Sequence, residues 1–123
     1  MRANELQIGD YVNYRGQIIK VSLLYDKGGS NEVGWSNKES VWVNADNVEP
    51  IPLTPEVLEK NEIDSVFKTR YKGFYLEYHA EAGMIMLYVY NNDSFQPTGI
   101  GFKYVHELQH ALRLCGIDKE IEL

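Results

Sequence analysis

The sequence predicts an α+β fold: an N-terminal SH3-like small β-barrel, a short connecting helix, and an antiparallel β-meander with one C-terminal helix packed on it. Two observations support this prediction. Apolar and polar residues alternate with a period of two within residues 6–25 and 66–90, as they do in half-buried strands. Residues 103–115 instead repeat their apolar positions at helical spacing, and Gly116 follows as a typical C-terminal stop.

The N-terminal lobe is expected to be the small barrel. Residues 6–25 predict two strands around a turn at Arg15-Gly16, and residues 26–31 predict a loop whose two glycines permit positive φ. Two further short strands are expected, at residues 33–35 and 41–43. Four or five short strands in about fifty residues are typical of a small barrel or a curled sheet.

The C-terminal lobe is expected to begin with a stiff connector at Pro50 and Pro52, since each proline fixes φ and removes a donor. Thr54 is a suitable N-cap for a short helix that ends near Asn61. An antiparallel meander, a polar loop and the C-terminal helix then follow, with strands at residues 66–70, 74–79 and 84–90 and the loop at 91–99. We expect two lobes, residues 1–50 and 51–123, in one compact structural unit.

The net charge of −6 restricts the partners of the chain. Lys and Arg number five against seven Asp and Glu in residues 1–50, and seven against eleven in residues 51–123, so neither lobe is basic. Nucleic-acid binding draws most of its affinity from positive charge. A nucleic-acid-associated small barrel is therefore an alternative that the charge disfavours, and anionic membrane surfaces are disfavoured for the same reason.

The sequence also indicates a compartment. No apolar run approaches the length that spans a bilayer, and residues 1–6 lack the apolar core of a secretory signal. Cys115 is the only cysteine, so no internal disulfide can form. We therefore expect a cytoplasmic protein with no membrane partner.

The pentapeptide His106-Glu107-Leu108-Gln109-His110 matches the H-E-x-x-H pattern of zinc metalloproteases. Residues four apart share a helix face, so both imidazoles could bind one zinc ion, and Glu107 could act as the catalytic base on a metal-bound water. A zinc-dependent hydrolase that uses His106, His110 and Glu107 is therefore an alternative function, with zinc as its cofactor.

Helix geometry and ligand count weigh against the zinc hydrolase. On a helical wheel the apolar stripe of Leu108, Leu112 and Cys115 lies opposite His106 and His110, which predicts that both histidines face solvent. A catalytic zinc normally takes three protein ligands. Only thirteen residues follow His110, and the remaining candidate is His79, upstream on a predicted strand. We therefore predict no catalytic residue, no bound metal and no cofactor.

Three stretches resemble a set of small uncharacterised proteins of gut bacterial genomes and their prophages or mobile elements. They are MRANELQIGDYV at residues 1–12, VEPIPLTPEVL at 48–58 and KYVHELQ at 103–109. In the proteins that this chain resembles, KYVHELQ is followed by Asn where this chain has His110. The resemblance implies a type of gene and no mechanism, and it implies that the second histidine is a departure of this chain.

The best candidate functional surface is a set of aromatic and methionine side chains suited to a partner interface. Met84, Met86, Tyr88 and Tyr90 share one face of a predicted strand, and packing of that face under the C-terminal helix is the favoured alternative. Trp35 and Trp42 in the barrel complete the set. We predict a non-catalytic accessory or interaction protein of phage or mobile-element type that binds a protein partner or itself.

Overall fold

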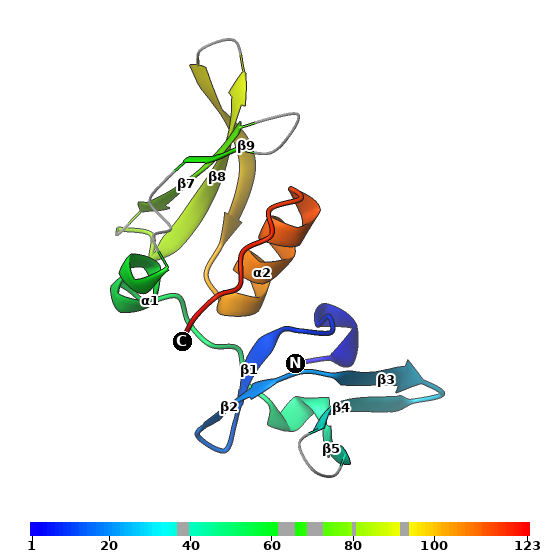
Figure 1. Cartoon of the computed structure of the whole chain (residues 1–123). Coiled ribbons are helices and arrows are strands. Elements are labelled where there is room, and N and C mark those ends of the chain that lie inside the picture. Colours follow the sequence, from blue (N-terminus) through cyan, green and yellow to red (C-terminus); the bar gives the residue numbers. More distant parts are fainter. Residues whose placement is uncertain (37–39, 62–65, 69–72, 80, 92–93) are drawn as a thin grey trace. The chain divides into compact units, whose positions relative to one another are not determined.

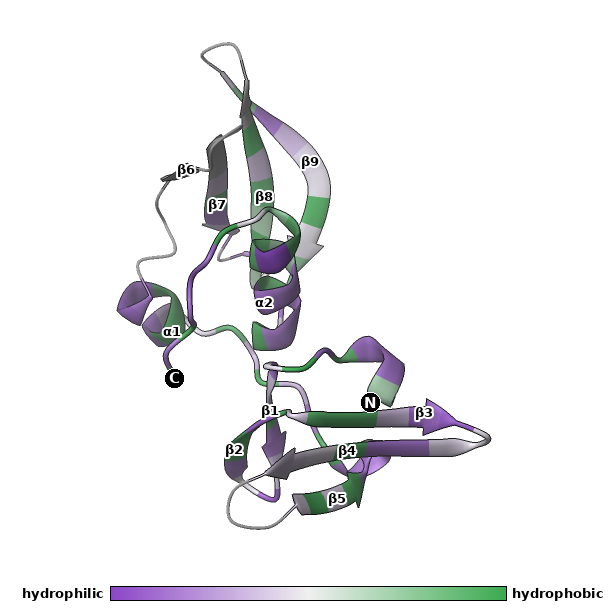
Figure 2. Ribbon diagram, turned by 45° about the vertical axis from the view of Figure 1, so that its right-hand side comes forward, coloured by the Kyte–Doolittle hydropathy of each residue, from purple (hydrophilic) through white to green (hydrophobic). Residues whose placement is uncertain are grey.

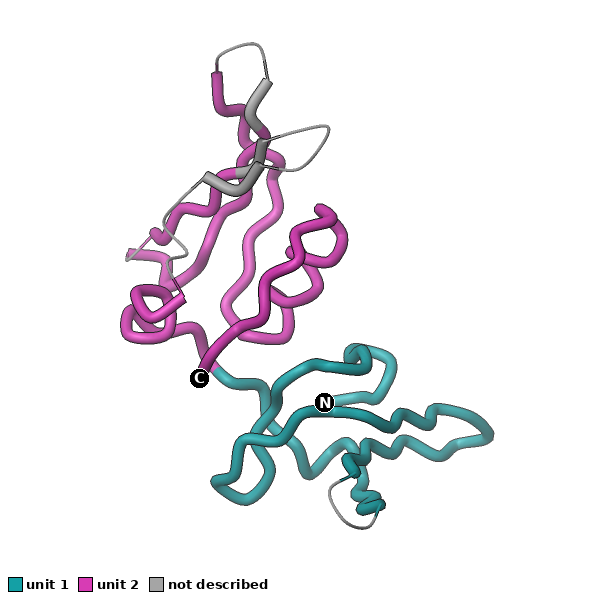
Figure 3. The backbone as a smooth tube through the Cα atoms, viewed as in Figure 1, with its two compact units in different colours: residues 1–51 teal, residues 52–123 magenta. Residues whose placement is uncertain are grey.

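The computed structural model describes residues 1–36, 40–61, 66–68, 73–79, 81–91 and 94–123 (Figure 1). For residues 66–68, 73–74 and 90–91 it describes the backbone alone. The chain forms two compact units, Met1–Ile51 and Pro52–Leu123 (Figure 3), one residue from the predicted lobe boundary. Antiparallel sheets and a C-terminal helix confirm the α+β class. That the lobes form one structural unit stays a prediction.

The first unit contains five short strands in two antiparallel sheets. The two-stranded sheet pairs β1 (Tyr11–Tyr14) with β2 (Gln17–Lys20), and the three-stranded sheet has the order β3 (Leu23–Lys27), β4 (Ser30–Ser36), β5 (Ser40–Asn44). Short 3-10 helices lie at Ala3–Glu5 (η1) and Ala45–Asn47 (η2). The prediction of two strands over residues 6–25 is wrong, because the chain changes sheets at Val21-Ser22 while its apolar alternation continues.

Both hairpins of the first unit close through two residues with positive φ. Arg15 and Gly16 have φ of 49° and 80°, and Gly28 and Gly29 have φ of 62° and 86°. Two consecutive positive φ values characterise the type I′ turn, whose twist matches that of the flanking strands. The predicted loop at residues 26–31 is therefore wrong in extent, because β3 and β4 continue to either side of the Gly28-Gly29 pair (Figure 2).

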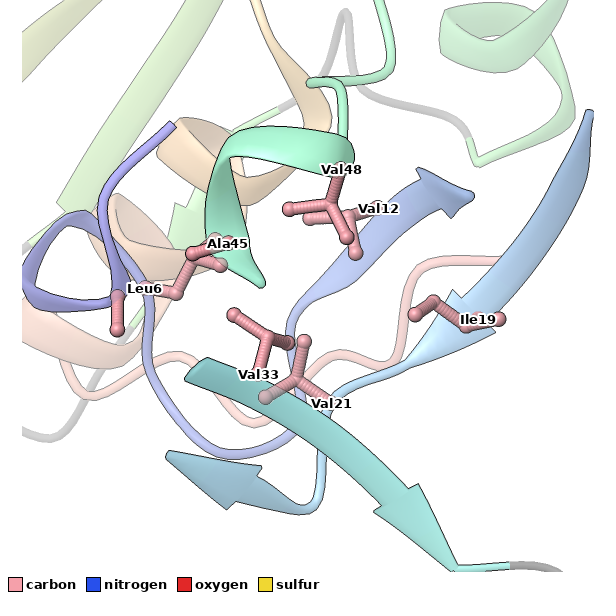
Figure 4. Close-up of a cluster of buried hydrophobic side chains, with 8 residues drawn as sticks. Leu6, Val12, Ile19, Val21, Val33, Ala45 and Val48 are labelled. Atoms are coloured by element: carbon pink, nitrogen blue, oxygen red, sulfur yellow. The ribbon is translucent and has the colours of Figure 1, made fainter. Parts of the chain in front are cut away.

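One apolar cluster holds the first unit together (Figure 4). Its buried members come from both ends of the unit, from β1, β2 and β4, and from the link after β2: Ala3, Leu6, Val12, Ile19, Val21, Val33, Ala45 and Val48. Two backbone hydrogen bonds between Asn13 and Glu49, of 2.9 and 2.8 Å, tie the end of the unit to β1. The described strands pair as separate sheets without closing, so the SH3-like barrel stays a prediction.

Along the chain, the second unit consists of a short helix, a four-stranded antiparallel sheet and a second helix. Helix α1 (Pro55–Lys60) starts at Thr54, whose Oγ1 accepts a hydrogen bond from Val57 N at 3.3 Å, as predicted. The sheet order follows the sequence: β6 (Val66–Lys68), β7 (Gly73–His79), β8 (Met84–Asn91) and β9 (Ser94–Phe102). Helix α2 (Val105–Leu114) confirms the predicted C-terminal helix. Residues 69–70 of the first predicted strand lie outside the described residues.

The sequence predicts a polar loop at residues 91–99, but residue 91 ends β8 and residues 94–99 belong to β9. Residues 92–93 lie outside the described residues. Pro97 pairs with Tyr88, and the register shifts between Met86 and Tyr88. Thr98 Oγ1 donates a hydrogen bond to the Leu87 carbonyl at 2.8 Å within this irregularity. The last strand of a sheet tolerates a proline and a bulge because its outer edge needs no ladder bond. The polar composition of these residues therefore led to the wrong prediction of a loop where β9 forms the edge of the sheet.

Helix α2 covers only one face of the sheet. Ile85 and Leu87 of β8 are 0% and 4% exposed, and they share their face with Phe102 of β9. Leu87 and Phe102 line the same cavity as Ala111 of α2, which places the helix on this side, and Figures 1 and 2 show α2 along the sheet. No described helix has the length and apolar character needed to cross a bilayer.

The C-terminal tail is fastened to α1 by Asn61, which is 2% exposed. Its Nδ2 donates to the carbonyls of Val57 and Glu122 at 2.7 and 2.8 Å, and its Oδ1 accepts from Glu122 N at 2.7 Å. The amide group thus pairs with Glu122 as a neighbouring strand would. This pairing holds Ile121, which is 2% exposed, in the core of the unit.

Replacing Asn61 with Ala is expected to lower the free energy of unfolding by about 1 to 3 kcal/mol, because part-buried backbone hydrogen bonds to Val57 and Glu122 are lost. Urea denaturation followed by circular dichroism measures the loss. Asn47→Ala, at an exposed position, is the control and is expected to change stability by less than about 0.5 kcal/mol. Equal stability of the two variants would contradict the role given to Asn61.

Candidate functional site

The two histidines of the H-E-x-x-H stretch lie side by side on α2. The rings of His106 and His110 are 5.6 Å apart between centroids and nearly perpendicular, at 77°. The Tyr104 ring stacks on His106, with centroids 6.0 Å apart and planes 13° apart. Their i, i+4 spacing therefore brings the imidazoles together as the sequence predicts.

The prediction that both histidines face solvent is wrong for His106. This side chain is 6% exposed and Gln109 is 7% exposed, whereas His110 is half-buried. The buried arc of α2 runs from Leu108 through Val105 and Leu112 to these two polar residues. A wheel that counts only apolar residues misplaces the centre of such an arc, because it assigns every polar side chain to solvent.

Glu107 caps α2 with its carboxylate. Its Oε1 accepts hydrogen bonds from the backbone N–H groups of Lys103 and Tyr104, both at 3.1 Å. An acidic residue at the third helical position commonly satisfies the free donors before a helix in this way. The oxygen that a metalloprotease would use on a metal-bound water thus serves the start of the helix.

The described residues bring together no group of three or more His, Cys, Asp or Glu side chains that could hold a metal ion. His79, the candidate third ligand, contacts Tyr88, and its partner in the strand register is Met84. These residues lie on the face of the sheet opposite Ile85 and Leu87, whereas α2 covers the Ile85 side. The sheet therefore separates His79 from the α2 histidines.

The alternative that Met84, Met86 and Tyr88 pack under α2 is wrong, because these residues point to the other side of β8. On that side Tyr75 lies between Tyr88 and Phe95, with its ring centroid 6.0 Å from that of Tyr88 and 5.2 Å from that of Phe95. The register partners of Met84 and Met86 are His79 and Glu77. We call this side of the sheet the open face, defined by Tyr75, Glu77, His79, Met84, Met86, Tyr88 and Phe95.

The methionines of the open face cover a glycine. A Cβ atom on Gly101 would lie 2.6 Å from Met84 Cε and 2.7 Å from Met86 Sδ. The two flexible side chains therefore lie across the backbone of β9, and this contact contributes to their half-buried state on the side of the sheet that α2 does not cover. Sequence reasoning found the methionines but not Gly101, because their contact crosses from β8 to a strand that was predicted as a loop.

A polar cluster sits within the open face. Tyr88 Oη lies 3.3 Å from His79 Nε2, and that nitrogen lies 3.7 Å from Glu77 Oε2. Burial raises the pKa of Tyr88 above its usual value, and the charge and hydrogen bond of Glu77 raise it further. The cluster gives an otherwise apolar and aromatic surface a localised hydrogen-bonding group.

The predicted partner surface also includes Tyr90 of the second unit and Trp35 and Trp42 of the first unit. The side chain of Tyr90 lies outside the described residues. In the first unit, Trp35 packs toward the apolar cluster. Trp42, which pairs with Gly34, lies on the opposite face of the sheet and is 45% exposed. The two tryptophans therefore belong to different faces. Trp35 stacks at a tilt on Tyr14, with centroids 5.4 Å apart, and Arg15 lies over that tyrosine.

Comparison with known proteins identifies no relative: no family model matches the chain, and no curated protein or solved structure is significantly similar to it.

Glu107→Ala is expected to lower the free energy of unfolding by about 1 kcal/mol, because two backbone donors at the start of α2 lose their acceptor. Glu107→Gln should cost less, since its amide oxygen can still accept. Urea unfolding of both variants, with exposed Glu59→Ala as the control, measures the difference. A Glu107→Ala protein as stable as the parent would contradict the capping role.

Glu77→Gln is expected to lower the pKa of Tyr88 toward its usual value of 10, because the nearby negative charge is removed. In the parent protein the pKa of Tyr88 is higher in the folded state than in the unfolded chain, so the unfolded chain loses the tyrosine proton at a lower pH. The free energy of unfolding therefore falls as pH rises from the usual pKa to the raised one. NMR titration of ring-labelled tyrosine, assigned with Tyr88→Phe, follows the pKa. Glu81→Gln is the control, and an unchanged pKa in Glu77→Gln would contradict the coupling.

Proposed function

We propose that this chain is a non-catalytic accessory protein whose open face binds a protein partner. One observation carries the proposal: α2 covers the Ile85 and Leu87 side of the sheet, and the methionine and tyrosine side lies opposite. The solvent-facing side of an antiparallel sheet is normally polar, so an apolar second face is suited to contact with another surface. A partner would supply the second cover.

The chemistry of the open face supports this proposal. Tyrosine, phenylalanine and methionine are enriched in protein interfaces, where they supply large contact areas. Phe95 is 43% exposed at one end, and the Glu77 and His79 side chains are 46% and 40% exposed beside Tyr88. Methionine side chains adapt to the shape of a partner. The face thus combines an adaptable apolar surface with polar groups that can set the orientation of a partner.

The zinc hydrolase is less well supported by the geometry of α2. Glu107 serves as a cap, and His79 lies on the other side of the sheet. A nucleic-acid-binding role is less well supported by the net charge of −6.

The setting of the protein is part of the same proposal. The resemblance at residues 1–12, 48–58 and 103–109 supports a gene of phage or mobile-element type, and the single cysteine supports the cytoplasm. For the first unit, the short antiparallel strands around one apolar cluster support an SH3-like arrangement.

Affinity capture with the parent protein should recover a partner from the native host. The amount of partner recovered should fall about ten-fold or more with Tyr88→Ala, because the variant removes an aromatic contact from the centre of the interface. Tyr25→Ala, at a 44% exposed tyrosine of the first unit, is the matched control and should retain the partner. Circular dichroism checks that both variants fold. Recovery that is equal across both variants and the parent would refute the open face as the binding surface.

A further inference from the structure

We infer a second binding site, an apolar pocket between β9 and α2 that accepts one large apolar side chain of a basic peptide. The pocket lies on the α2 side of the sheet, away from the open face, so it goes beyond the proposed function. Leu87, Ile100 and Phe102 of the sheet and His110, Ala111 and Leu114 of α2 line a volume of about 250 Å³.

The pocket exists because α2 has a small residue where it faces β9. Ala111 lines the cavity, and its single methyl group is too short to fill the space toward Ile100 and Phe102. The buried arc of the helix, which runs from Leu108 through Leu112 and Val105 to Gln109 and His106, lies on another side. An apolar occupant of this pocket would remove the apolar side chains that line it from water.

The rim of the pocket carries apolar residues that a folded chain normally shields. Leu114 is 83% exposed and Ile100 is 45% exposed, and both line the pocket. An apolar occupant would therefore gain contacts inside the pocket and cover two aliphatic side chains at its mouth. Single apolar residues scattered over a surface need no explanation. Ile100 and Leu114, however, line the same apolar cavity and form one patch with it.

Size and charge select the occupant. Pockets for whole small-molecule ligands measure about 300 to 1,000 Å³, so a volume of 250 Å³ suits a single anchoring side chain. Residues 52–123 carry seven Lys and Arg against eleven Asp and Glu, and acidic Glu107 lines the pocket. This charge attracts lysine and arginine beside the anchor and disfavours a second copy of this chain, itself at −6.

The test is a methyl NMR titration of the full chain with the peptide acetyl-KKFKK-amide. Signals of Leu87, Ile100 and Leu114 should shift and saturate. The matched peptide acetyl-KKSKK-amide should bind at least about ten-fold more weakly, since it lacks the anchor. The peptide acetyl-EEFEE-amide should also bind more weakly, because its charge repels Glu107 and its surroundings.

Two variants test the pocket itself. Ala111→Phe, which fills the cavity, and Leu114→Lys, which places a cation at its mouth, should each weaken binding of acetyl-KKFKK-amide about ten-fold or more. Leu114 is so exposed that its replacement should leave the fold intact even if Ala111→Phe does not. Ile18→Ser, at a 53% exposed residue of the first unit, should leave the affinity unchanged.

The possible contrary results are distinguishable. Absence of saturable shifts at millimolar peptide, or equal binding of the phenylalanine and serine peptides, would overturn the pocket. Shifts confined to the methyl groups of Met84 and Met86 would overturn it while supporting the open face. Concentration-dependent shifts at Leu114 without peptide would instead assign the site to a second copy.

Discussion

The arrangement of the second unit depends on which apolar face of strand β8 is covered by helix α2. Strand β8 carries apolar side chains on both faces, and α2 covers the face of Ile85 and Leu87. Burial of apolar area stabilises that side, and α2 cannot be on both sides. The methionines compensate in part by lying across Gly101. In the described part of the unit, the open face thus results from the position of α2 on the opposite side of the sheet, and the proposed function rests on this face.

The same helix explains the H-E-x-x-H stretch without catalysis. A helix that follows an edge strand directly must satisfy the free N–H groups at its start. Glu107 does so for Lys103 and Tyr104, and the backbone of Lys103 in turn accepts from Leu53 N at 2.8 Å. Helical spacing alone places His106 beside His110. The pattern that suggests a zinc site is therefore also explained by a glutamate that caps the helix and by two histidines one turn apart.

Sequence patterns predicted the strands whose side chains alternate and the helices whose ends are capped, because both signals are local. Helix α1 begins after Thr54, and β7 and β8 lie close to their predicted positions. Strand β9 was missed because an edge strand with Pro97 and Thr98 looks polar. The extent of β3 and β4 was missed because Gly28-Gly29 can belong to a long loop or to a two-residue turn.

The sequence by itself determined the α+β class and the neighbouring positions of His106 and His110. These features follow from residue order over a few turns or strands. Only the tertiary structure decided which face of β8 the helix covers, that His106 is buried, and that a cavity remains beside Ala111. Those outcomes depend on how far each side chain reaches toward elements distant in sequence, which no local pattern contains.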